Sequence, residues 1–241
     1  MPATTEGHRI RNDVRVPVLT LQSETDVTLL GGHWARQPDS SNFRLWEVAG
    51  AAHFDTYGLH ASLYDDGFRT AAELAQLISS AGTFEPEEGP SYNCGWQQHY
   101  VLQSAAHHLE RWARAGIEPP TAARLEVNPV GTTLRRDDMG IAVGGVRTPW
   151  VDVPLATLSG ARESTQEYAF GMLFGSTMPL PPERKSALYP TGRDEFLARF
   201  SAATDKALEL GHLLAADRDE IVAVADEAWS ITTTSTGGGK L

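Results

Sequence analysis

Two stretches near the start of the chain decide the fold. Residues 16–26 read VPVLTLQSETD, and residues 43–55 read FRLWEVAGAAHFD. The first stretch is a short apolar run that ends in polar residues, which is typical of a strand covered on both faces. The second alternates apolar and polar residues before a small loop, and about 20 residues separate the two runs, enough for a parallel crossover. The sequence therefore predicts two neighbouring parallel strands.

An acid and a histidine follow these two predicted strands. Asp26 comes after the first strand and His53 after the second. Open parallel sheets place their ligands beyond the carboxyl ends of the strands, so both residues are candidate site residues. Other interpretations stay open, because Asp26 could simply cap the next helix and His53 could be an ordinary loop histidine. Glu24 is a second candidate for the acid, and Asp55 is interpreted as a helix-start carboxylate.

Further motifs accompany these two stretches. They are HHLERW at 107–112, GGVRTP at 144–149, LFGST at 173–177 and LYP at 188–190. Together with residues 17–26 and 48–55, they resemble a bacterial family of α/β-hydrolase domain proteins, in its C-terminal half. The resemblance implies an α/β fold with Asp26 as the acid of a catalytic triad and His53 as its base. It also implies a sheet of roughly eight strands, so most of that sheet is expected to precede Met1.

The sequence contains no nucleophile for such a triad. The nucleophile elbow of this fold has the form Gly-x-Ser-x-Gly, and no serine of the chain fits it. Ser159 and Ser176 each have a single adjacent glycine, and they follow His53, whereas the fold places its nucleophile before the acid. Cys94 also follows His53 and is an equally weak candidate. The nucleophile is therefore expected from residues that precede this chain.

Four regions are expected along the chain. They are a loose segment 1–14, the C-terminal part of an α/β-hydrolase core at 15–123, a hairpin and helical extension at 124–231, and a disordered tail at 232–241. Apolar spacing predicts helices over 70–79, 95–115, 194–211 and 219–229. Turn signals predict a hairpin over 124–146, an extended segment over 144–154 and a loop at about 178–190, with the remainder helical.

The later regions contain further candidate site residues. Arg147 is a weak candidate for substrate binding, although such an arginine more often ties down a loop. His99, His107 and His108 share a predicted helix, but the i, i+4 pair of a zinc helix is absent. A lone cysteine gives no paired metal ligands either, so no metal site is predicted. Two tryptophans of this helix, Trp96 and Trp112, are interpreted as core residues.

Composition excludes some classes of function. The chain has 20 basic and 31 acidic residues, a formal charge of −11, which argues against binding to nucleic acid or to an anionic membrane surface. The sequence also lacks an apolar run of about 18 residues and the order of a signal peptide. Neither observation assigns a compartment.

These observations lead to an expected function. The chain is expected to be the C-terminal portion of a serine α/β-hydrolase that cleaves a small-molecule carboxylic ester without a cofactor. By itself it is expected to be inactive, because the serine and the oxyanion donors lie outside it. The alternative is a non-catalytic binding or assembly module that pairs with an N-terminal partner chain, or with itself, through an open strand edge.

Overall fold

Two parallel strands organise the first part of the structure. The computed structural model describes residues 8–11, 13–60, 67–79, 91–93, 95, 97–161 and 169–234. Strand β1 (Val18–Ser23) pairs in parallel with β2 (Phe43–Val48), and Ser23 lies opposite Val48 at the end of the ladder. A short helix α1 (Glu24–Thr28) and a 3-10 helix η1 (Gly32–Ala35) form the crossover. The two predicted strands and their parallel pairing are confirmed.

The two strands differ in how deeply they are buried. All six residues of β2 are buried, whereas five of the six residues of β1 are only partly buried. Beyond β2 the ladder continues for one bridge, in which Val48 pairs with Val146 and Ala49 N donates to Val146 O at 3.1 Å. On its other side, β1 pairs with no strand in the described part of the chain. The outer edge of β1 is therefore open among these residues.

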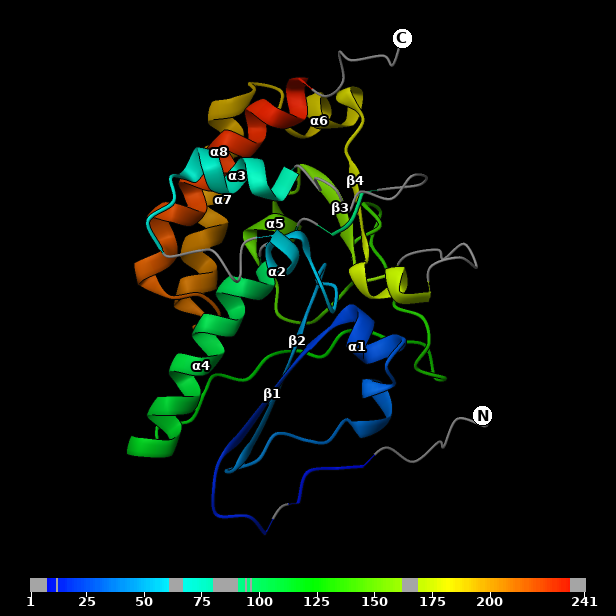
Figure 1. Ribbon diagram of the computed structural model, residues 1–241, viewed down its shortest axis with the longest axis vertical. Helices are drawn as coiled ribbons and strands as arrows, with labels where there is room; N and C mark the ends of the chain where they lie inside the picture. Colours follow the sequence, from blue (N-terminus) through cyan, green and yellow to red (C-terminus); the bar gives the residue numbers. More distant parts are fainter. Residues whose placement is uncertain are drawn as a thin grey trace.

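Helix α4 (Gln97–Ala115) covers one face of the two strands. Its residues Tyr100, Val101 and Ala105 share one hydrophobic core with Trp46 and Val48 of β2. The partly buried side chains of β1 that pack on this core are Leu19 and Leu21. Figure 1 shows α4 on one side of β1 and β2, with α1 on the other side. The predicted helix over 95–115 is confirmed from Gln97 onward.

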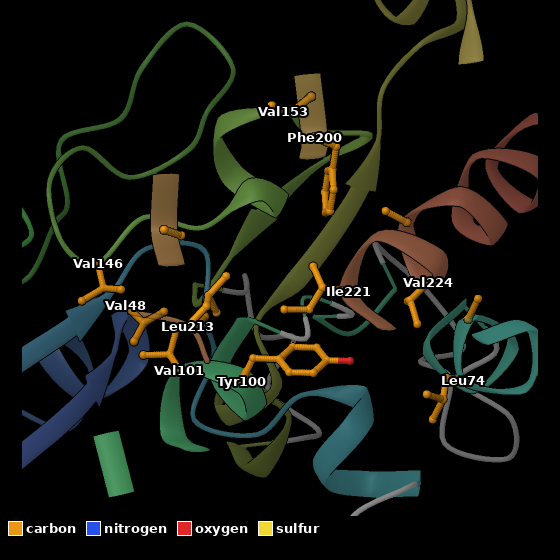
Figure 2. Packing of buried hydrophobic residues seen from close by; sticks show 14 of the residues in the cluster. Val48, Leu74, Tyr100, Val101, Val146, Val153, Phe200, Leu213, Ile221 and Val224 are labelled. Atoms are coloured by element: carbon orange, nitrogen blue, oxygen red, sulfur yellow. The ribbon is translucent and has the colours of Figure 1, made fainter. Parts of the chain in front are cut away.

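Three further helices complete the main core. Helices α3 (Ala71–Ser79) and α7 (Arg193–Glu209) both pack against α8 (Arg218–Thr234). Figure 2 shows Tyr100 of α4, Phe200 of α7 and Ile221 of α8 within this core. The helices predicted over 70–79, 194–211 and 219–229 are thus confirmed, but α8 runs three residues into the tail predicted from residue 232. In the described residues, no helix is both long enough and apolar enough to cross a membrane.

The region after residue 148 departs from the sequence prediction. Two short antiparallel strands are present, β3 (Ala156–Ser159) and β4 (Ser176–Pro179). Strand β3 and the start of β4 lie where helix was expected, and the end of β4 lies in the loop expected at about 178–190. Strands of four residues are at the lower limit of the length over which alternation identifies a strand. The remaining short helices are α2 (Thr56–His60), α5 (Pro149–Asp152), η3 (Ala169–Phe174), α6 (Pro182–Leu188) and η4 (Ala215–Asp217).

Proline explains two of these differences. Helix α5 interrupts the segment predicted as extended over 144–154, and α6 occupies the loop predicted at 178–190. Each helix has a proline in its first turn, Pro149 and Pro182 respectively. A proline at that position is already set for helical φ and lacks an N–H that would otherwise be left without a partner. The expected extended segment is therefore wrong at Pro149–Asp152, and the expected loop is wrong at Pro182–Leu188.

The predicted hairpin over 124–146 is present as single bridges rather than as long strands. The antiparallel bridges join Leu125 to Gly144, Val127 to Leu134 and Arg136 to Ala142. This segment supplies most of a second, smaller core, composed of Val27, Ala49, Leu125, Leu134, Ile141, Ala142 and Val151. Because Val27 belongs to α1 and Ala49 follows β2, the hairpin packs directly beneath the ends of the two parallel strands.

Both cores draw residues from both sides of the expected boundary between 123 and 124. The larger core joins Trp46 and Tyr100 to Phe200 and Ile221, and the smaller one joins Val27 to residues of the hairpin. The expected extension therefore packs with the expected hydrolase core as one body. Residues 1–7, 12 and 235–241, which include most of the predicted tail, lie outside the described residues.

Gly145 gives a test of this packing. Its φ is +72°, and a Cβ there would lie 2.6 Å from Glu47 O, the acceptor for Val146 N. We predict that Gly145→Ala lowers the free energy of unfolding by about 3 kcal/mol, from left-handed strain and steric displacement together. Gly116→Ala is the matched control, because Gly116 has a φ of +69° with no atom within 4 Å of its Cβ position. Gly116→Ala should lower the free energy of unfolding by only about 1 kcal/mol, as measured by urea unfolding. Equal losses for the two variants would contradict the packing argument.

Candidate active site

Asp26 and His53 are in direct contact. His53 Nδ1 lies 2.6 Å from Asp26 Oδ1, and the two side chains are 39% and 22% exposed. Asp26 lies in α1, directly after β1, and His53 lies in the loop that follows β2. Parallel strands end at the same edge of their sheet, which brings the two loops together. The structure therefore joins the two residues that the sequence selected.

The Asp26 carboxylate is shared between this contact and the start of α1. Its Oδ2 accepts hydrogen bonds from Ser23 N and Ser23 Oγ, both at 2.7 Å, while Asp26 N donates to Ser23 Oγ at 3.2 Å. This is a capping box, in which each end residue satisfies the other's backbone N–H. Asp26 therefore both caps α1 and contacts His53, although the sequence presented these two roles as alternatives. The cap holds Oδ2 and leaves Oδ1 directed at the imidazole.

This arrangement sets the chemistry that His53 can perform. A carboxylate beside Nδ1 favours the tautomer that carries its proton on Nδ1, so that Nε2 keeps a free lone pair. Such an imidazole can accept a proton at Nε2, and the carboxylate stabilises the imidazolium that forms. The pair can therefore serve as an oriented general base.

A hollow of about 470 Å³ lies beside His53. We call it the β1-edge hollow; its lining residues are Thr20, Leu21, Gln22, Asp26, Leu30, Gly32, His53, Gln98 and Leu102. Three consecutive residues of β1 line it, and consecutive residues point to opposite faces of a sheet. The hollow therefore runs along the outer edge of β1, between α4 and the α1–η1 crossover.

The β1-edge hollow contains no serine or cysteine among its lining residues. Its two glutamines each have a buried side-chain oxygen without a hydrogen-bond partner, on Gln22 and on Gln98. Sequence reasoning did not identify either glutamine. Gln22 stands next to the polar end of β1, which is a usable signal, whereas Gln98 reaches the hollow only through the packing of α4 on the strands.

Two other acidic residues near the pair have different roles. Glu24, the second candidate for the acid, is fully buried, and its carboxylate binds Gly50 N, Gly160 N and Arg136 rather than His53. Asp55 Oδ1 accepts from Gly58 N at 2.7 Å in the first turn of α2, as expected of a helix-start carboxylate. Burial raises the pKa of Asp55 to about 6 and also raises the pKa of Glu24.

The two serines weighed as nucleophiles lie outside the β1-edge hollow. Ser159 Oγ accepts from Arg136 Nη2 at 2.8 Å and from Ala161 N at 3.0 Å. Ser176 Oγ donates to Ala161 O at 2.9 Å. Both hydroxyl groups thus take part in structural hydrogen bonds near β3 and β4. Cys94 lies outside the described residues.

Arg147 lies away from the β1-edge hollow. Its side chain donates to Asp152 Oδ1 at 2.5 Å and to two backbone carbonyls, Ala142 O at 2.8 Å and Val151 O at 3.3 Å. These bonds hold the turn into α5, so the weak substrate-binding assignment has no support in the geometry. The structure places this arginine in the loop-tying role weighed beside it.

The remaining sequence candidates are distributed along α4. The ring of His99 packs on that of Tyr57 with centroids 4.0 Å apart, and His108 Nε2 lies 2.9 Å from Gly211 O. Across the described ranges, no group of three or more His, Cys, Asp or Glu residues is placed to hold a metal ion. Trp112 is buried as predicted, and Trp96 lies outside the described residues.

Comparison with known proteins adds one finding. A family model described as alpha/beta hydrolase domain matches residues 1–223. The match spans β1, β2, the hairpin and most of the later helices. Searches of curated proteins and of solved structures each give no match.

The buried Asp55 gives a test of the electrostatics beside His53. Its pKa rises from an unfolded value near 3.8 to about 6 in the fold, so the folded state resists ionisation. The raised pKa contributes about 3 kcal/mol to the free energy of unfolding. This contribution is fully present below about pH 4 and is lost as pH rises through about 6.

We predict that Asp55→Asn removes this part of the pH dependence. Asparagine keeps an oxygen for Gly58 N but cannot ionise. Urea unfolding of both proteins across this pH range measures their free energies of unfolding. As pH rises, the difference should grow in favour of the variant by about 3 kcal/mol. A difference that stays constant with pH would show that Asp55 ionises normally in the fold.

Proposed function

Because the chain belongs to the alpha/beta hydrolase domain family, we propose that Asp26 and His53 are the acid and the base of a hydrolase's catalytic triad. The observation that carries this proposal is the 2.6 Å contact between His53 Nδ1 and Asp26 Oδ1. Their order along the chain, acid before histidine and each after a parallel strand, is the order that this fold uses.

In the proposed reaction, His53 Nε2 removes the proton from a serine hydroxyl as that oxygen attacks an ester carbonyl. Asp26 keeps the imidazole oriented and stabilises its positive charge. The imidazolium then protonates the leaving alcohol, and an acyl-serine remains. Water completes the reaction with His53 again acting as base, which regenerates the serine and releases the carboxylic acid.

We propose that the serine comes from polypeptide outside the described residues, and that it precedes the acid in the order that this fold uses. Two observations support this location. The β1-edge hollow has no serine or cysteine lining it, and β1 has no strand partner on that side within the described ranges. A nucleophile strand placed along this edge would end beside His53, because parallel strands end at the same edge of a sheet.

The proposed substrate class is a small-molecule carboxylic ester. A serine, histidine and aspartate triad supplies its own nucleophile and base, so this chemistry needs no cofactor. The alcohol and acyl groups would be selected by residues around the serine, together with the walls of the β1-edge hollow. Its apolar walls include Leu30 and Leu102, which are 53% and 54% exposed.

We predict that this chain alone does not hydrolyse esters. In a fluorogenic short-chain ester assay, the purified chain should give the rate of buffer, because no serine or cysteine among the described residues lines the hollow beside His53. Turnover well above buffer that is abolished by His53→Ala would contradict the proposal. His107→Ala is the matched control, since His107 is exposed on α4; activity that survives both substitutions would indicate a contaminant.

The second candidate function is a non-catalytic assembly module. The open outer edge of β1 favours it, because an unpaired strand edge can pair with a strand of another chain. The exposed side chains Leu30 and Leu102 flank that edge and would be covered by the partner.

Light scattering after size-exclusion chromatography tests self-assembly. If the edge of β1 assembles the chain, the mass should exceed that of one 26.2 kDa chain, and Leu102→Glu should restore the monomer. Leu210→Glu is the matched control, because Leu210 is exposed to a similar extent beyond α7. A monomer at every concentration would count against self-assembly.

A further inference from the structure

The buried Glu24 links three segments that are distant in sequence. Its Oε1 accepts from Gly50 N at 2.6 Å, and its Oε2 accepts from Gly160 N at 3.0 Å and from Arg136 Nη2 at 3.0 Å. The side chain has no exposed surface. Glu24 thereby joins the start of α1 to the histidine loop, residues 50–53, and to the end of β3.

Backbone contacts from the same segment hold the rest of the histidine loop. Glu24 N donates to Ala51 O at 3.1 Å, and His53 N donates to Thr25 Oγ1 at 3.2 Å. Thr25 Oγ1 in turn donates to Gly160 O at 2.7 Å. The two residues before Asp26 therefore fix the backbone of the loop at Gly50, Ala51 and His53.

The close approach at Gly160 is part of this arrangement. A Cβ at that position would lie 2.5 Å from Glu24 Cβ and 2.5 Å from Ala51 O. Only glycine lets the end of β3 meet both Glu24 and the histidine loop without displacement of one of them. The arrangement thus depends on residues from three separate regions of the chain.

The charge of Glu24 is partly offset within the fold, although burial still raises its pKa. Burial disfavours the carboxylate, whereas Arg136 and the two N–H groups stabilise it. Arg136 is held in place by further bonds to Gly140 O at 2.9 Å and to Ser159 Oγ at 2.8 Å. A buried carboxylate with this many donors is a rigid connection, because loss of any donor leaves a buried polar group without its partner.

We infer that Glu24 is a positioning residue for His53, and that Thr25 extends its effect to the backbone of His53. Glu24 holds the histidine loop in the position in which His53 Nδ1 contacts Asp26 Oδ1. The importance of this positioning for catalysis rests on the proposed function. The positioning itself is a property of this chain and is measurable without turnover.

Glu47 provides a matched control. It is also a fully buried glutamate, and it accepts from Arg36 Nε at 2.6 Å, from Arg36 Nη2 at 2.7 Å and from Leu125 N at 2.7 Å. Like Glu24, it is a buried glutamate that accepts three hydrogen bonds from an arginine and from backbone N–H, but these bonds tie β2 to Arg36 and to the hairpin rather than to the histidine loop. Glu24→Gln and Glu47→Gln should therefore cost similar stability but differ in their effect on His53.

The experiment compares the low-field proton resonance of His53 Nδ1–H in the two variants by NMR. We expect Glu47→Gln to leave this resonance at its wild-type position. Glu24→Gln should shift it upfield or abolish it through exchange with water, because the histidine loop moves and the bond to Asp26 lengthens. Loss of the resonance in Asp26→Asn assigns it to this bond.

Several results would overturn the inference. They are an unchanged His53 resonance in Glu24→Gln, or equal changes in Glu24→Gln and Glu47→Gln. Should Glu24→Gln fail to fold, Thr25→Val tests the same connection without altering a charge. It should also lose the resonance, while Thr204→Val, at a buried threonine within α7, should keep it. A resonance retained in Thr25→Val would then contradict the inference.

Failure of the proposed function gives a different pattern. If this chain, tested together with the proposed nucleophile polypeptide, does not hydrolyse esters, the NMR result for Glu24→Gln stands unchanged. If it does, Glu24→Gln should lower kcat by about 100-fold with little change in KM, because a misplaced base affects the transition state more than substrate binding. Glu47→Gln should leave kcat within about threefold of wild type once the protein is folded.

Discussion

The parallel pairing of β1 with β2 is the constraint on which the rest of the structure depends. Its register places Ser23 opposite Val48, so the segments that follow β1 and β2 leave the sheet side by side. Asp26 then lies three residues beyond one strand end and His53 five residues beyond the other. A slip of one residue would turn the buried side chains of β2 to the opposite face. The contact between acid and histidine is therefore a consequence of strand register.

Buried carboxylates connect this sheet to the later part of the chain. Glu47 of β2 binds Leu125 N, and Glu24 of α1 binds Gly160 N and Arg136, so the sheet and the helix after β1 are both tied to the region after residue 123. Each bond replaces hydration that the carboxylate loses on burial. The region predicted as an extension is thus part of the setting of the candidate active site. The family match over residues 1–223 covers the same extent.

The sequence predicted those features that depend on local pattern. The apolar run of β1, the polar residues after it and the long apolar stripe of α4 identified elements that the structure confirms. Strands β3 and β4 could not be found in this way, because each has four residues and is stabilised by its partner across a long connection. The role of Glu24 was equally hidden, since Gly160 and Arg136 reach it only through the tertiary fold.

The central claim of the proposed function is that His53 faces a serine supplied from beyond the described residues. The most direct measurement is a crystal structure of the protein that contains both this chain and the nucleophile polypeptide, after reaction with an organophosphonate. The account predicts a phosphonylated serine whose Oγ lies within about 3.2 Å of His53 Nε2, at the end of a strand paired with β1. A phosphonylated residue remote from His53, or a strand pairing that leaves β1 open, would contradict it.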